Sequence, residues 1–187
     1  MPILAKESDS YPPDLLDRDW FGEGDWWVMH TLPKREKSLA RQLEKHRVAF
    51  YSPTFSRQYR SPAGRMRTSQ ILLFPNYVFV FGTPQDRLAA LTTNCIARCI
   101  EVPKGGQNSL LDDLKRIRQV IEAGIDLTPE GQLQPGDTVR VKSGPMEGVI
   151  GTVVERRGKK RLIVEINFIQ RGASVELRDL DVEPYTR

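Results

Sequence analysis

The stretch G-D-T-V-R-V-K-S-G-P-M-E-G-V-I-G-T-V-V-E, residues 136–155, decides how the second half of the chain folds. Apolar and polar residues alternate over 138–141 and again over 149–155, which is typical of strands with one buried face. Gly144-Pro145 predicts a tight turn between them, and Gly148 and Gly151 allow a bend or bulge before the second strand. We therefore expect two antiparallel strands joined by a shaped turn.

The residues that follow continue the strand pattern. The side chains that share one face by their period of two are Leu162, Val164, Ile166 and Phe168. Val175 and Leu177 add one more apolar alternation. About five short strands within some 50 residues favour a small β-barrel.

The first half mixes strands with helices. Trp26–Thr31 is aromatic and β-branched, as strands are, and Pro33 suits the first turn of a helix that reaches about His46. The stretch L-F-P-N-Y-V-F-V, Leu73–Val80, has a strand pattern that Pro75-Asn76 interrupts. Strands, helices and hairpins in this order predict an α+β sandwich with an antiparallel sheet.

Changes in composition divide the chain into four parts. Residues 1–24 are punctuated by Pro and Gly and predict a partly disordered extension. Residues 25–124 form the first predicted domain, and 135–187 the second. The segment 125–134 between them has no apolar periodicity and is the predicted linker.

Composition narrows the class of protein. A chain of 187 residues suits one or two small domains, and no apolar run approaches the roughly 20 residues that cross a bilayer. Its two cysteines, Cys95 and Cys99, are too few for a disulfide framework and suit a reducing cytosol. The net charge of +4 and a pI near 9.2 lean towards a nucleic-acid partner. We expect a cytoplasmic monomer that does not associate with membranes.

The sequence contains no motif that predicts catalysis. It has no phosphate-binding loop and no Ser/His/Asp constellation, and its carboxylates are scattered. Cys95 and Cys99 lack the second pair of ligands that a zinc site needs, so buried thiols are the better interpretation. We expect no catalytic residue, no metal site and no cofactor, and therefore no enzyme.

Three pieces in order resemble one protein family. The stretch 136–155 is similar to a KOW motif, which lies in an SH3-like barrel, and Trp26–Thr31 and Leu73–Val80 resemble the NGN domain that precedes it in the NusG/RfaH family of transcription elongation and antitermination factors. The resemblance covers roughly residues 26–184. It implies an NGN α/β sandwich followed by a small SH3-like β-barrel.

The resemblance implies a contact with RNA polymerase. In this family an apolar pocket of the NGN domain binds the coiled-coil clamp helices of the polymerase. The positions that match this pocket, whose rings we expect to face outward, are His30, Phe74, Pro75, Tyr77 and Phe79. The alternative is that Tyr77 and Phe79, which point the same way by their spacing, belong to the core.

A row of basic residues accompanies the first predicted helix. Lys34, Lys37, Arg41 and Lys45 fall on one side of a helical wheel, opposite Leu39 and Leu43. They are candidates for contact with the non-template DNA strand, although most such rows are simply solvated. The arginines between residues 57 and 67 are a second candidate.

Two departures from the usual family pattern favour a specialised member. Asn76 stands where the housekeeping factor has Gly, and Phe168–Leu177 reads F-I-Q-R-G-A-S-V-E-L. The resemblance implies a specialised paralogue that suppresses pausing or termination in long operons. Phe168 and Ile169 are the candidate partner-binding positions of the barrel, with a ribosomal protein or Rho as the candidate partners. The alternatives are a housekeeping factor that couples transcription to Rho or the ribosome, and a ribosome-associated RNA-binding KOW protein.

Overall fold

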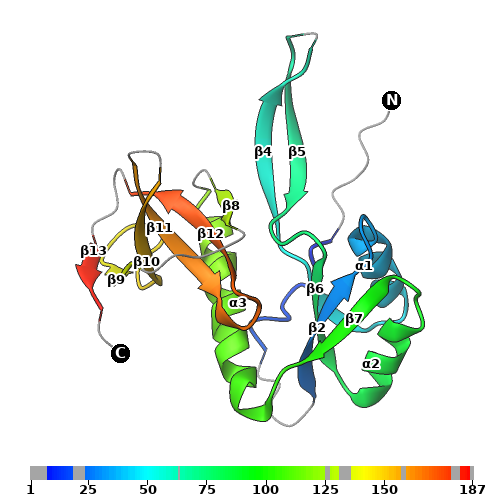
Figure 1. The fold of residues 1–187 in the computed structure, drawn as a ribbon. Coiled ribbons are helices and arrows are strands. Elements are labelled where there is room, and N and C mark those ends of the chain that lie inside the picture. Colours follow the sequence, from blue (N-terminus) through cyan, green and yellow to red (C-terminus); the bar gives the residue numbers. More distant parts are fainter. Residues whose placement is uncertain are drawn as a thin grey trace. The chain divides into compact units, whose positions relative to one another are not determined.

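The computed structural model describes residues 8–18, 24–62, 64–124, 127–130, 136–156, 159–177 and 182–185. The chain packs as two compact units, Met1–Gln107 and Asn108–Arg187, which are described separately. Within the described residues, no helix is long and apolar enough to span a bilayer. Figure 1 traces the elements along the chain.

The first unit is built on a five-stranded antiparallel sheet with the strand order β1-β3-β6-β2-β7. Strands that are consecutive in the sequence are often not adjacent in the sheet. For example, β6 lies between β3 and β2. The strands are β1 (Ser10–Tyr11), β2 (Asp25–Thr31), β3 (Ala49–Tyr51), β6 (Tyr77–Gly82) and β7 (Ile96–Glu101).

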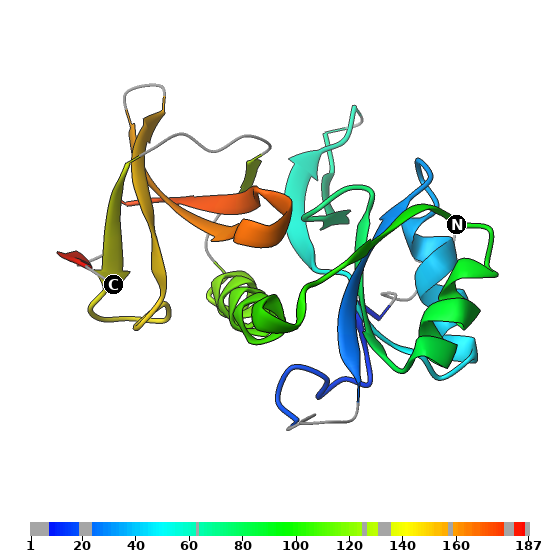
Figure 2. The same cartoon turned by 60° about the horizontal axis from the view of Figure 1, so that its bottom comes forward.

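Two helices cover one side of this sheet, α1 (Glu36–Lys45) and α2 (Pro84–Leu91), as Figures 1 and 2 show. Strand alternation sends Trp27 and Met29 of β2 into the buried cluster, where Leu39 and Leu43 of α1 also lie. The helix α2 starts at a capping box in which the Thr83 hydroxyl accepts from the Asp86 amide. These contacts fix α1 against the sheet.

A separate antiparallel hairpin extends from this unit. Its strands are β4 (Thr54–Arg60) and β5 (Met66–Leu72), which pair over their full length. The chain turns from β3 into β4 at Ser52-Pro53, so these two strands, which are close in sequence, lie in different sheets. Figure 1 shows the hairpin extending away from β2 and β6.

The N-terminal extension is more ordered than its composition predicts. β1 pairs with the edge strand β3, and the Ser52 amide donates to the Asp9 carbonyl at 2.7 Å. Leu15 and Leu16 are buried. Backbone pairing with the edge strand β3 and the burial of two leucines order this segment, although its composition predicts disorder. Residues 1–7 and 19–23 lie outside the described part of the chain.

The second unit confirms the predicted barrel. Its six strands are antiparallel throughout, in the order β13-β9-β10-β11-β12-β8. Gly144 turns the chain with φ of +89°, and a Cβ on Gly151 would collide with the backbone of β11. The elements are β8 (Thr128–Glu130), β9 (Asp137–Val141), β10 (Ile150–Arg156), β11 (Lys159–Ile166), the 3-10 turn η2 (Asn167–Ile169), β12 (Arg171–Glu176) and β13 (Val182–Pro184).

The units divide earlier than the expected boundary at residue 124. After the short turn η1 (Lys104–Gly106) comes the helix α3 (Gln107–Glu122), which packs with the second unit from Asn108 onward. Residues 128–130 of the expected linker form β8, which pairs with β12. A three-residue edge strand has too short a pattern to be recognised in a sequence.

A buried carboxylate ties α3 to the barrel. Asp113 Oδ2 accepts hydrogen bonds from the Asn167 amide at 3.0 Å and from Asn167 Nδ2 at 3.4 Å, and Oδ1 pairs with Arg116. Burial raises the pKa of Asp113 above its usual value, because desolvation outweighs these favourable contacts. Burial also raises the pKa of Glu165, and the Asp113 charge adds to that shift.

We predict that Asp113→Asn flattens the pH dependence of barrel stability. A carboxyl with a raised pKa binds its proton more tightly in the folded state, so stability falls as pH rises from about 4 through the raised pKa of Asp113. The variant should therefore gain stability relative to the parent over this range, since it lacks the buried charge. Urea titrations followed through the NMR cross-peaks of β11 measure this, with Asp112→Asn on the exposed neighbour as control. Parallel pH curves for parent and Asp113→Asn would contradict the prediction.

Candidate functional site

The turn before β6 places the central residues of the site. The Tyr77 amide donates to the Phe74 carbonyl at 3.1 Å, which closes the turn over Pro75 and Asn76. Asn76 has φ of +68°, in the left-handed region that Asn tolerates better than most residues. The Thr31 amide donates to the Asn76 carbonyl at 2.9 Å and so joins the turn to the end of β2. Asn76 therefore suits the left-handed backbone position of this turn.

A buried glutamate fixes this turn from the other side. Glu36, the first residue of α1, is 5% exposed, and its carboxylate accepts a hydrogen bond from the Asn76 amide at 2.9 Å. The N-terminal end of a helix also favours a negative charge. The turn is thus held by β2 and by α1 together.

His30 and Tyr77 form the accessible aromatic part of the site. They lie opposite each other in β2 and β6, with ring centroids 5.1 Å apart and ring planes at 73°. Such an edge-to-face pair is a favourable aromatic geometry. Both residues are half-buried, and Pro75 beside them is exposed. We call these three residues the aromatic corner.

Phe74 and Phe79 are buried, although the resemblance predicted that their rings face outward. They are 2% and 0% exposed, and their rings meet edge to face at 6.3 Å. Tyr77 and Phe79 do share a face, but Phe79 has Tyr51 of β3 on one side and Val28 of β2 on the other, whereas the pairing of β3 stops before it reaches Tyr77. The ring in the middle of the sheet is therefore buried and the ring at its end is accessible.

The structure adds a residue that sequence reasoning missed. Leu32 follows Thr31 and is 42% exposed, although it is a large apolar side chain. Its amide donates to the Cys95 carbonyl at 2.9 Å, which fixes the backbone next to the aromatic corner. The available signal was an apolar residue between the end of a strand and Pro33, where no core position is expected.

The basic row is shorter than predicted. Lys37, Arg41 and Lys45 are exposed and lie four residues apart on α1, so they share one side of it. Lys34 does not belong to this helix, because α1 begins at Glu36 and Lys34 lies in the preceding turn with φ of +62°. We call Lys37, Arg41 and Lys45 the basic helix face.

The second unit presents its candidate residues on a turn. Phe168 and Ile169 lie in η2 between β11 and β12, and both are half-buried. Gln170 ends the turn in the left-handed region, with φ of +51°. Asp113 binds the amide of Asn167, the first residue of η2, where a helical turn has an unsatisfied donor. The turn is thus held in shape by α3.

A polar hollow of about 600 Å³ lies between α3 and the barrel. Its walls combine acidic and basic side chains, and none of its lining residues is a histidine or cysteine. The arrangement offers hydrogen bonds and charge. The residues lining it are Ser109, Asp112, Lys115, Arg116, Thr138, Ile150, Gly151, Thr152, Glu165, Asn167 and Tyr185.

Two family models match the chain in order. The model described as "Transcription termination factor nusG" matches residues 24–116, which include the aromatic corner and the basic helix face. The KOW motif model matches residues 135–166, which cover β9 to β11. These are the two parts that the sequence motifs predict.

Curated relatives match along nearly their whole length. The chain is 26% identical to the transcription termination/antitermination protein NusG of Halalkalibacterium halodurans, over 86% of this chain and 98% of the relative. It is 27% identical to the protein of the same name from Pseudomonas aeruginosa, over 84% and 97%. A solved structure titled "Domain interaction in Thermotoga maritima NusG" aligns at 20% identity over 88% of this chain and 98% of that one, with a TM-score of 0.48. On the two domain models and these relatives, the chain belongs to the NusG family of transcription termination and antitermination factors.

Proposed function

We propose that this protein binds the clamp helices of RNA polymerase through the aromatic corner and suppresses pausing or termination. The observation that carries the proposal is an accessible His30–Tyr77 pair beside an exposed proline, on a turn held by Glu36. Aromatic side chains on a rigid backbone are favoured at protein interfaces, because little entropy is lost when they bind. Leu32 extends the apolar contact, while Phe74 and Phe79 support it from within.

The proposed mechanism is a shift of populations without chemistry. A factor that binds the transcribing form of the polymerase better than its paused form raises the population of the transcribing form. The basic helix face lies on the helix that Glu36 begins, and its three positive charges suit the phosphates of the non-template DNA strand. The barrel is a separate unit that recruits a second partner through Phe168 and Ile169.

We further propose that the protein is a specialised paralogue acting in the cytoplasm as a monomer. The motif F-P-N-Y at residues 74–77 and the sequence of η2 and β12 support the specialised role. The turn in η2 replaces a glycine-containing stretch of the housekeeping pattern, so its partner contact differs from that with Rho or a ribosomal protein. A housekeeping role is the second candidate, because both curated relatives carry the NusG name.

We predict that Tyr77→Ala weakens binding to core RNA polymerase by about 30-fold, the effect of losing an interface hot spot. Tyr77→Phe keeps the ring and should stay within about threefold of the parent, since the contact is apolar. Biolayer interferometry with immobilised core polymerase measures the affinities. Tryptophan fluorescence, which comes from Trp20, Trp26 and Trp27 in the first unit, checks folding.

Two further variants make this test specific. Tyr59→Ala removes a more exposed tyrosine of the first unit and should leave polymerase affinity unchanged. Phe74→Ala should instead lower the unfolding free energy by about 3–5 kcal/mol, because it empties a buried site. If Tyr77→Ala binds as tightly as the parent, the aromatic corner is not the contact.

We predict that the paired change Lys37→Glu and Arg41→Glu reduces the salt dependence of binding to an elongation complex. Each lost phosphate contact should lower the slope of log affinity against log salt by about one. Titrations between about 50 and 200 mM salt measure the slope, and Lys142→Glu on the barrel is the control. An unchanged slope would remove the basic helix face from the interface.

A further inference from the structure

The β4–β5 hairpin carries a concentrated positive charge. Residues 54–72 contain four arginines and no acidic residue, and their charge of +4 equals the net charge of the whole chain. The remainder of the protein is therefore formally neutral. The net positive charge of the whole chain equals the charge of this one hairpin. The four arginines are Arg57, Arg60, Arg65 and Arg67.

Strand register places most of this charge on one face. Residues that lie opposite each other in an antiparallel pair point to the same side, and the side alternates along the strand. Arg57 lies opposite Ser69, and Tyr59 lies opposite Arg67, so these residues share a face. Arg60 lies opposite Met66 on the other face.

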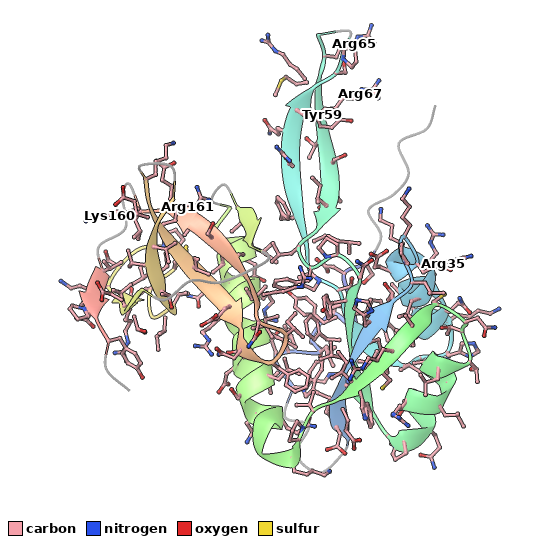
Figure 3. The ribbon with its side chains drawn as sticks, in the orientation of Figure 1. Arg35, Tyr59, Arg65, Arg67, Lys160 and Arg161 are labelled. Carbon is pink, nitrogen blue, oxygen red and sulfur yellow. The ribbon has the colours of Figure 1, made fainter. Side chains whose placement is uncertain are left out.

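The tip continues the same face. The Ser61 amide donates to the Arg65 carbonyl at 2.9 Å, which extends the pairing by one step beyond the strands. Ser61 and Arg65 are each two residues away from Tyr59 and Arg67, and side chains alternate between faces. Arg65 therefore lies on the same face of the hairpin as Tyr59 and Arg67. Figure 3 labels Tyr59, Arg65 and Arg67 in the outer part of the hairpin. We call Arg57, Tyr59, Arg65 and Arg67 the arginine–tyrosine face.

These side chains are accessible. All four residues of the arginine–tyrosine face are exposed, and Tyr59 is 44% exposed. Within the described part of the chain, none of these guanidinium groups makes an ion pair. The opposite face is held by neutral contacts, such as the hydrogen bond from Gln70 Nε2 to Ser56 Oγ at 2.7 Å.

We propose that the arginine–tyrosine face binds single-stranded nucleic acid. An exposed aromatic ring offers a stacking platform to any base, and guanidinium groups on either side of it suit the flanking phosphates. Arg57 lies about 7 Å from Tyr59 along the same strand, and Arg67 lies directly opposite Tyr59 on the neighbouring strand. Both arginines are therefore within reach of a nucleotide stacked on Tyr59. Single-stranded DNA and single-stranded RNA share this chemistry. The site is distinct from the basic helix face and does not need the polymerase contact.

Protection of exposed strand edges is another use of charged side chains in hairpins. That use is indifferent to which face a charge occupies, and it does not need an exposed tyrosine between arginines. The two faces of the hairpin therefore provide a matched experiment, because Arg67 and Arg60 are both exposed arginines on opposite sides of one ribbon.

The test uses the full chain and fluorescein-labelled 15-nucleotide strands of mixed sequence, as DNA and as RNA, together with the corresponding DNA duplex. Fluorescence anisotropy at about 100 mM salt gives the affinities. We expect Arg67→Glu and Tyr59→Ala each to weaken single-strand binding about tenfold. Arg60→Glu, which changes the charge equally, should weaken it less than threefold, and Tyr59→Phe should bind like the parent.

Three results would overturn the proposal. Equal losses for Arg60→Glu and Arg67→Glu would mean that net charge acts without a defined face. Unchanged binding of Tyr59→Ala would mean that no base stacks there. Duplex binding as tight as single-strand binding would also exclude stacking. A preference for DNA or RNA identifies which strand the face takes, and either preference supports the proposal.

The test is independent of the proposed function because no polymerase is present. Tyr77→Ala, which removes the proposed polymerase contact, should bind the strands like the parent protein. The NMR cross-peaks of β4 and β5 show whether each variant keeps the hairpin. A variant that loses these cross-peaks is replaced by Arg57→Gln, which removes one charge from the same face, and a normal affinity for Arg57→Gln counts against the proposal.

Discussion

The hydrogen bond from the Asn76 amide to the Glu36 carboxylate is the constraint on which the candidate interface depends. It joins the start of α1 to the turn before β6, two elements that are distant in sequence. A buried carboxylate without a donor is costly, so this bond restricts where the turn can lie. The same turn is joined to β2 through the Thr31 amide. The aromatic corner is therefore rigid before any partner arrives, which lowers the entropy lost on binding.

The position of a ring along β6 decides whether that ring is buried in the sheet or partly accessible. Phe79 and Tyr77 point to the same side of β6, yet only Phe79 has a strand on both sides. Phe79 is fully buried, whereas Tyr77 at the end of the strand is half-buried. In the second unit, the buried Asp113 holds the turn that carries Phe168 and Ile169. In both units a carboxylate of a helix fixes an aromatic turn.

Sequence patterns predicted the architecture well where periodicity is long. The alternation in β9 to β11 and the glycines around Gly144 predicted the barrel, and Pro75-Asn76 predicted the interruption that precedes β6. Sequence patterns could not show how deeply a residue is buried. Alternation fixes the face of the sheet on which a side chain lies, but it does not show which strands lie beside it. The burial of Phe79 between Tyr51 and Val28 is a consequence of the strand order β3-β6-β2. The order of the N-terminal segment depended on pairing with a distant edge strand, which no local pattern reports.

Site-specific crosslinking tests the central claim most directly. A photo-crosslinking amino acid replaces Tyr77 in one protein and Leu88, an exposed residue of α2, in another, and each is irradiated with a transcribing complex. The account predicts a crosslink from position 77 to the clamp helices of the polymerase and none from position 88. A crosslink to the clamp helices from position 88 but not from position 77 would contradict it.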